Sequence, residues 1–270
     1  MPPAAPHIPA GAAVLVVGAG PFQLGLIEAV QARGLRVVVV DRNADAPGMR
    51  AADVAEPCDI IDVPAVVAVA RRHRVVAVAS SASDAAMPAV AGVAEALDLP
   101  GQRPAVIQTC RNKLLTYQAV AAAGLPVPAT VAVASPAEAM AAVDDVGSYP
   151  VVIKPRSAAG GRGVSIVRSF SELGPAFARA EAAGRGSGVL VQGFVGGESV
   201  GVEAVFWQGE LLDAFVLVDT YREGFVSPVG HALPCPWPAE RQAAVAAAAA
   251  GFAKACGLTH GQANFDLRDA

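Results

Sequence analysis

The sequence VVIKPRSAAGGRGVSIV, residues 151–167, is the most informative stretch of this chain, because it joins two apolar strands through a glycine-rich turn. Lys154 stands at the end of the first strand, and Gly160, Gly161 and Gly163 follow it. Glycine lets backbone N–H groups approach phosphate oxygens without interference from a Cβ atom, and an ammonium group supplies a compact positive charge. The pattern predicts a site for nucleotide phosphates. The alternative is a glycine-rich hairpin whose lysine merely extends its charged end into solvent.

The rarity of lysine favours the first interpretation. The chain contains only Lys113, Lys154 and Lys254, while most of its other basic residues are arginine. A lysine at the end of a buried strand is therefore less typical of ordinary surface decoration.

Composition indicates a globular protein with a large core. The chain has 270 residues, of which 54% are apolar and 16% charged, so one large or two medium domains are expected. The net charge of −4 and the lack of a basic cluster beyond residues 71–74 argue against a nucleic-acid partner. The four cysteines form no CxxC pair, which suits the reducing cytoplasm. We expect neither a signal peptide nor a membrane span, since no long apolar run occurs.

The N-terminal part alternates between apolar strands and helical patterns, as in a doubly wound parallel sheet. We predict an α/β fold whose first domain, residues 1–105, is Rossmann-like. Its predicted elements are strands at 14–17, 36–41, 59–62 and 75–80, and helices at 22–33, 64–72 and 84–97.

The region after residue 105 mixes helices with strands that pair through turns. A hairpin is predicted at residues 208–210, where Gln-Gly-Glu separates two apolar strands. The other predicted elements are helices at 103–108, 111–124, 136–143, 171–183 and 240–256, and strands near Lys154 and Gly163 and at 189–192, 200–207, 211–219 and 261–267.

The first glycine-rich turn gives a weaker signal for a dinucleotide. Gly18, Gly20 and Gly25 follow a GxGxxxxG spacing instead of the GxGxxG fingerprint. Asp41 ends the second strand, however, at the position from which an acid can bind a ribose hydroxyl. The spacing favours a turn that closes the scaffold or contacts substrate, and NAD binding is the alternative.

An ordered series of short segments follows residue 105. The segments are Asn112-Lys113, GLPVP at 124–128, PVVIKP at 150–155, the glycine loop at 160–163, VQGFVGGE at 191–198, GHALP at 230–234 and NFD at 264–266. In this order they resemble the ATP-grasp superfamily of carboxylate–amine/thiol ligases, which carry a Rossmann-like domain before the ATP-grasp domain. The resemblance covers nearly the whole chain.

This resemblance implies that Lys113 and Lys154 contact ATP phosphates and that the loop from Gly160 to Gly163 folds over them. It implies that Gln192, where the family usually has Glu, holds adenine by its side chain.

The same resemblance places the backbone near Phe194 and Val195 against adenine and Glu198 on the ribose hydroxyls, with Ser199 as a competitor. Asp266 resembles the first of two ligands for Mg²⁺, which Mn²⁺ can replace; the alternative is a solvent-facing acid. A structural hydrogen bond is the favoured interpretation of His231, whose role stays open, and no catalytic residue is assigned.

The family continues beyond the point where this sequence stops, with a strand that carries E-x-N-P-R. The resemblance therefore implies an ATP-grasp domain at residues 106–270 that lacks its last strands, with a first lobe at 106–186 and an incomplete second lobe at 187–270. Because the second strand supplies the remaining metal ligands, we expect the chain alone to turn over poorly.

The implied activity is an ATP-dependent ligase that joins a carboxylate to an amine, or a similar nucleophile, through an acyl phosphate and releases ADP and phosphate. Its partners would be these two small molecules, together with a complementing C-terminal half or a second copy of the chain. The alternatives are a non-catalytic ATP-binding fragment or subunit of a split ligase, and an NAD-dependent oxidoreductase.

Overall fold

The computed structural model describes residues 8–222 and 228–269, and it divides the chain into two compact units. Unit 1 comprises Met1–Gln108 with Thr259–Gly261, and unit 2 comprises Thr109–Leu258 with Gln262–Ala270. Both units combine helices with sheets, and the predicted α/β fold class is confirmed.

Unit 1 is built on a parallel sheet in the order β3-β2-β1-β4. Its strands are β1 (Ala13–Val17), β2 (Arg36–Asp41), β3 (Val54–Pro57) and β4 (Ala77–Ala79). The strand predicted at residues 59–62 is wrong, since β3 lies before it. Asp59 instead accepts the amide of Ile61 at 3.1 Å in a turn, and Asp62 caps the next helix through the amide of Ala65 at 3.1 Å.

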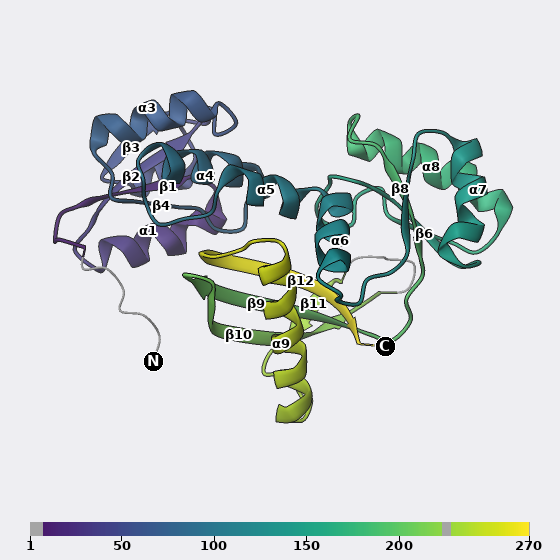
Figure 1. Ribbon diagram of the computed structural model, residues 1–270. Helices are drawn as coiled ribbons and strands as arrows, with labels where there is room; N and C mark the ends of the chain where they lie inside the picture. The colour runs from purple at the N-terminus through teal and green to yellow at the C-terminus, as the bar shows by residue number, and fades with distance from the viewer. Residues whose placement is uncertain (1–7, 223–227, 270) are drawn as a thin grey trace. The chain divides into compact units, whose positions relative to one another are not determined.

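Helices pack against both faces of this parallel sheet (Figure 1). Leu15 and Val17 of β1 pack in a cluster with α3 and α4, whereas Val16 packs in a second cluster with α1 and α2. This alternation follows from the two-residue period of a strand. The helices of unit 1 are α1 (Leu24–Gln31), α2 (Pro47–Ala51), α3 (Val63–His73) and α4 (Met87–Ala96), with short 3-10 turns η1 (Pro21–Gln23) and η2 (Asp84–Ala86).

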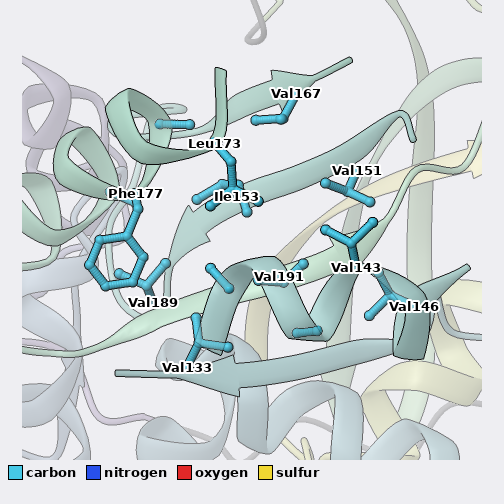
Figure 2. Packing of buried hydrophobic residues seen from close by; sticks show 14 residues of the cluster. Val133, Val143, Val146, Val151, Ile153, Val167, Leu173, Phe177, Val189 and Val191 are labelled. Carbon is cyan, nitrogen blue, oxygen red and sulfur yellow. The ribbon is translucent and has the colours of Figure 1, made fainter. Parts of the chain in front are cut away.

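The first sheet of unit 2 is antiparallel, in the order β5-β8-β6-β7. Figure 2 shows how Ile153 and Val191 of this sheet pack against Val143 of α7 and Leu173 of α8. One face of β6, the strand that carries Lys154, therefore packs against this hydrophobic core. The elements are β5 (Thr130–Val133), which we did not predict, α7 (Pro136–Val146), β6 (Val151–Pro155), β7 (Ser165–Val167), α8 (Phe170–Gly184) and β8 (Val189–Gly193).

The second sheet of unit 2 has the order β11-β10-β9-β12 and is covered on one face by α9. Val200 and Val202 of β9 point to that face and are buried, while Glu203 lies on the other. The predicted hairpin joins β9 to β10, with φ of +53° at Gln208 and +84° at Gly209. The elements are β9 (Glu198–Trp207), β10 (Glu210–Thr220), β11 (Gly230–Ala232), α9 (Ala239–Ala255) and β12 (Gly261–Asp269).

Two further helices precede these sheets, α5 (Pro104–Arg111) and α6 (Lys113–Ala122). Asn112 caps α6, because its side-chain oxygen accepts the amide of Leu114 at 3.1 Å. No helix in the described ranges is long and apolar enough to cross a bilayer.

Candidate functional site

The ammonium of Lys154 is buried and held entirely by neutral oxygens in the contacts that the structure describes. Its Nζ atom donates to the hydroxyl of Tyr117 at 2.6 Å and to Oε1 of Gln192 at 2.6 Å. The Tyr117 ring lies below it, with 4.8 Å between Nζ and the ring centroid. Only 8% of the Lys154 surface is exposed. A buried cation without a carboxylate partner is costly, so its charge is well suited to an incoming anion.

Lys113, the other predicted phosphate lysine, begins α6 next to the glycine-rich loop. Its amide donates to the carbonyl of Arg156 at 3.0 Å, and its Nζ donates to the carbonyl of Ala158 at 2.7 Å. The backbone bond ties the start of α6 to the end of the lysine strand. The side-chain bond ties Lys113 to the loop itself. The second cation therefore lies beside the predicted phosphate loop.

The glycine-rich loop uses backbone conformations that favour glycine. Gly160, Gly161 and Gly163 have φ of +64°, +66° and +75°. A Cβ atom on Gly163 would lie 2.6 Å from the Cβ of Ala183 in α8, so this glycine also permits close packing. Nothing lies within 4 Å of a Cβ built on Gly160. The loop is thus anchored at Gly163 and open at Gly160.

The predicted adenine segment lies at the end of β8, and its polar side chain, Gln192, forms hydrogen bonds within the protein. Gln192 is buried, and its amide is used at both ends, because Oε1 accepts from Lys154 and Nε2 donates to the hydroxyl of Thr130 at 2.8 Å. In this arrangement the side chain links Lys154 to Thr130, and its predicted contact with adenine stays a prediction. Phe194 and Val195 lie beyond the strand end, Phe194 39% exposed and Val195 half-buried.

Glu198, predicted to bind ribose, is paired in this structure with an arginine. Arg241 of α9 contacts Glu198 Oε2 at 2.6 Å and Asp269 Oδ2 at 2.6 Å, and its guanidinium stacks 3.5 Å from the Trp237 ring centroid. The competitor Ser199 donates to Asp219 at 2.7 Å. The ribose contact of Glu198, with Ser199 as its competitor, stays a prediction, and a ribose at Glu198 would share that carboxylate with Arg241.

Asp266, the predicted metal ligand, lies on β12 among other acids. Its side chain reaches solvent, yet the protein around its carboxyl group removes much of its hydration, and this desolvation raises its pKa. The charges of Asp219 and Glu203 raise the pKa further, whereas those of His231 and Lys113 oppose the rise. The described residues contain no group of three or more acidic, His or Cys side chains that could hold a metal ion.

His231 lies on β11 and is fixed by a buried acid. The Asp219 side chain is 1% exposed, and its carboxylate accepts from Nδ1 of His231 at 2.9 Å as well as from Ser199. This hydrogen bond links β11 to β10 and agrees with a structural role for His231. Sequence reasoning overlooked Asp219, since a single acid at the end of a strand carries no signal that it is buried.

Tyr117 and Thr130 are further site residues that sequence reasoning missed. Tyr117 follows Lys113 by one helical turn, and a spacing of four residues places both side chains on one face of α6. That spacing was a usable signal. Thr130 lies on a strand that was not predicted.

The first glycine-rich turn, in unit 1, uses Asp41 as a structural acid. Its carboxylate accepts the amides of Ala19 and Asn43, each at 2.9 Å. Gly18 has a φ of +95° in this turn. Both Asp41 oxygens are thus engaged by the backbone, which favours the scaffold interpretation over a ribose contact.

Comparison with known proteins adds independent observations. Residues 110–227 match the family model of the ATP-grasp domain. The chain is 34% identical over 240 residues to the formate-dependent phosphoribosylglycinamide formyltransferase of Burkholderia cenocepacia (strain HI2424), a match that spans 84% of this chain and 55% of the relative. The chain spans about half the length of the curated relatives it matches.

Two solved structures share the fold. An ADP complex of N5-carboxyaminoimidazole ribonucleotide synthetase superposes with a TM-score of 0.82 at 19% identity, over 97% of this chain and 68% of that one. The biotin carboxylase domain of 2-oxoglutarate carboxylase from Hydrogenobacter thermophilus, in complex with MgADP, ADP and bicarbonate, superposes with a TM-score of 0.77 at 18% identity. That match covers 95% of this chain and 61% of the other.

Proposed function

This chain contains an ATP-grasp domain, and we propose that the protein is an ATP-dependent ligase that activates a carboxylate as an acyl phosphate and transfers the acyl group to an amine or a similar nucleophile. The observation that carries this proposal is the buried ammonium of Lys154, which has only neutral acceptors in its described contacts. A polyphosphate supplies the negative charge that this environment lacks.

The chain's own residues would bind and orient the nucleotide. Lys154 and Lys113 neutralise phosphate charge, and the amides of the glycine-rich loop contact phosphate oxygens where Gly160 leaves the backbone open. Adenine would lie against the segment of Phe194 and Val195 beyond β8. The partly exposed ring of Phe194 fits a role in covering a base.

The chemistry then needs positioning more than a protein nucleophile. A carboxylate oxygen attacks the γ-phosphorus, and the bond between that phosphorus and the bridging oxygen breaks, releasing ADP. The nitrogen of the amine next attacks the acyl carbon, the bond from that carbon to the phosphate oxygen breaks, and the amine loses a proton to solvent. The two lysines stabilise charge on the transferring group in the first step.

Mg²⁺, or Mn²⁺ in its place, would be held by Asp266 together with phosphate oxygens and water. The oxygen donor fits such an ion, and the acids Asp219 and Glu203 add a negative field around it. When bound, the cation neutralises phosphate charge. Its further ligands would be phosphate oxygens or residues outside the described part of the chain.

The relatives suggest a substrate class. The Burkholderia protein is named as a formate-dependent phosphoribosylglycinamide formyltransferase. We propose a small carboxylate, with formate as the first candidate, and an amine as acceptor.

The four cysteines are free, which fits a reducing compartment, and we propose that the protein is cytoplasmic.

Hydroxylamine trapping tests this function directly. The full-length natural protein is incubated with MgATP and each of several carboxylates, and an acyl phosphate is captured as a hydroxamate. We expect hydroxamate and ADP in equal amounts with one carboxylate and neither without it. Saturable ATP binding with no hydroxamate or ADP from any carboxylate would refute the ligase proposal and leave a nucleotide-binding role.

A further inference from the structure

Tyr117 occupies a central place between the two predicted phosphate lysines. Its hydroxyl accepts from Lys154 Nζ at 2.6 Å, and its ring faces the same ammonium at 4.8 Å. On α6 it lies one turn after Lys113. No motif of the sequence analysis includes this residue, and its position in the sequence gave no sign of its contact with Lys154.

The electrostatic surroundings of Tyr117 are cationic. Burial alone would raise the pKa of its phenol, but the charge of Lys154 and the hydrogen bond from it, with smaller contributions from Gln192 and Lys113, lower the pKa overall. The groups that act on the phenol are thus two ammonium groups and one neutral amide.

We propose that Tyr117 is a positioning residue of the nucleotide site, which holds the Lys154 ammonium in place by one hydrogen bond and one cation–π contact before phosphate arrives. The inference rests on the proposed function. A lysine side chain loses considerable conformational entropy when it is fixed, and a cation that is already ordered spares that cost on binding. Gln192, itself held by Thr130, supplies the second fixed acceptor.

Ionisation of Tyr117 would reverse this effect. A phenolate beside Lys154 neutralises the charge that the phosphate needs, so ATP affinity should fall as pH rises through the Tyr117 pKa. Conversely, bound phosphate should raise that pKa, because it adds negative charge next to the phenol. This linkage distinguishes positioning at the site from a role in folding alone.

A pair of substitutions separates the two contacts. Tyr117→Phe removes the hydroxyl and keeps the ring, and we expect its Kd for ATP to rise about fivefold to tenfold by isothermal titration calorimetry. Tyr117→Leu removes the ring as well and should raise Kd further. Tyr149→Phe is the matched control, since Tyr149 packs against the hydrophobic core of the first sheet. Circular dichroism and urea unfolding establish that each variant is folded.

The pH profile supplies the second readout. Between about pH 7 and 10, we expect ATP affinity to fall earlier in the wild type than in Tyr117→Phe, and ATP to raise the pH at which one tyrosine ionises in ultraviolet difference spectra. Unchanged ATP binding by Tyr117→Phe would overturn the inference. Tighter binding would overturn it too, because it would show that the phenol competes with phosphate for Lys154. Unchanged binding by Lys154→Met as well would mean that the proposed function itself fails.

Discussion

Replacing Lys154 by methionine removes the buried ammonium and keeps a side chain of similar length. Lys154 Nζ forms two hydrogen bonds of 2.6 Å to neutral acceptors, and the residue as a whole is 8% exposed. A phosphate oxygen about 4 Å from this charge would gain about 4 kcal/mol in a medium of effective dielectric constant near 20. Part of that gain offsets desolvation of the phosphate. We therefore expect a net loss of about 2–3 kcal/mol, which is a roughly 30-fold to 150-fold increase in the Kd for ATP.

The same substitution should change stability much less than binding. Methionine loses two hydrogen bonds, but it also removes a charge that the fold had to desolvate, and these contributions oppose each other. The free energy of unfolding in urea should change by less than about 2 kcal/mol. Binding is measured by isothermal titration calorimetry with ATP and with adenosine, which has no phosphate. Adenosine affinity should stay unchanged.

Lys254→Met is the matched control for this prediction. Lys254 is an exposed residue near the end of α9, so its removal takes the same charge from the chain at an exposed position on another element. We expect it to bind ATP as the wild type does. If Lys154→Met retained wild-type affinity for ATP while adenosine binding stayed equal, the proposal that the buried Lys154 ammonium binds phosphate would be refuted.

Three further predictions follow from individual contacts. Asp266→Asn should abolish the Mg²⁺ dependence of ATP binding in calorimetry while raising the melting temperature at pH 7, because a carboxyl group whose pKa is raised in the fold destabilises the fold when ionised. Gly163→Ala should lower the free energy of unfolding by about 1–3 kcal/mol in urea, since its φ is +75° and its Cβ would lie 2.6 Å from that of Ala183. Glu56→Gln should cost about 1 kcal/mol at pH 7, because the hydrogen bond from His73 lowers the pKa of Glu56. That contribution is present above the ordinary glutamate pKa and is lost as pH falls below it, so wild type and variant should converge in stability near pH 3.

Each of these predictions has an internal comparison. Gly160→Ala has the same backbone strain as Gly163→Ala but open space around its Cβ, so it should destabilise less. A Glu56→Gln profile that stays parallel to the wild type at every pH would contradict the assigned hydrogen bond. Retention of the wild-type Mg²⁺ dependence by Asp266→Asn would remove Asp266 from the metal site.

Most of the fold was predictable because periodicity and turn residues acted together. Val37 and Val39 alternate with Val38 and Val40 between two helical layers, and a run buried on both sides is typical of a parallel strand. The strand at Val54–Pro57 was missed because its exposure alternates and it contains Pro57 and Glu56. The strand was predicted instead at the nearby apolar pair of residues 60–61, which lies in a turn.

The candidate site was predictable only as far as its residues lie within contiguous motifs. Lys154, Gly160 and Gly163 are in one segment, so their proximity follows from the chain itself. The partners of Lys154 come from α6 and β8, and pairing of β6 with β8 places Gln192 directly opposite Val152. Register of this kind depends on packing throughout the sheet and cannot be read from local spacing. The adenine contact assigned to Gln192 from resemblance stays a prediction, and its contact with Lys154 is an observation that the motif alone did not provide.

Charge is distributed over unit 2 in a way that suits a metal–nucleotide complex. Cations lie on α6 and β6, where Lys113 and Lys154 border the glycine-rich loop, and acids lie on the second sheet around Asp266. The charge of Lys113 opposes the rise of the Asp266 pKa, more weakly than the charge of His231 does. An anion on the lysines would weaken that opposing influence and raise the need for a cation at Asp266. Phosphate binding and metal binding should therefore favour each other, and ATP affinity should depend on Mg²⁺ more strongly in the wild type than in Lys113→Met.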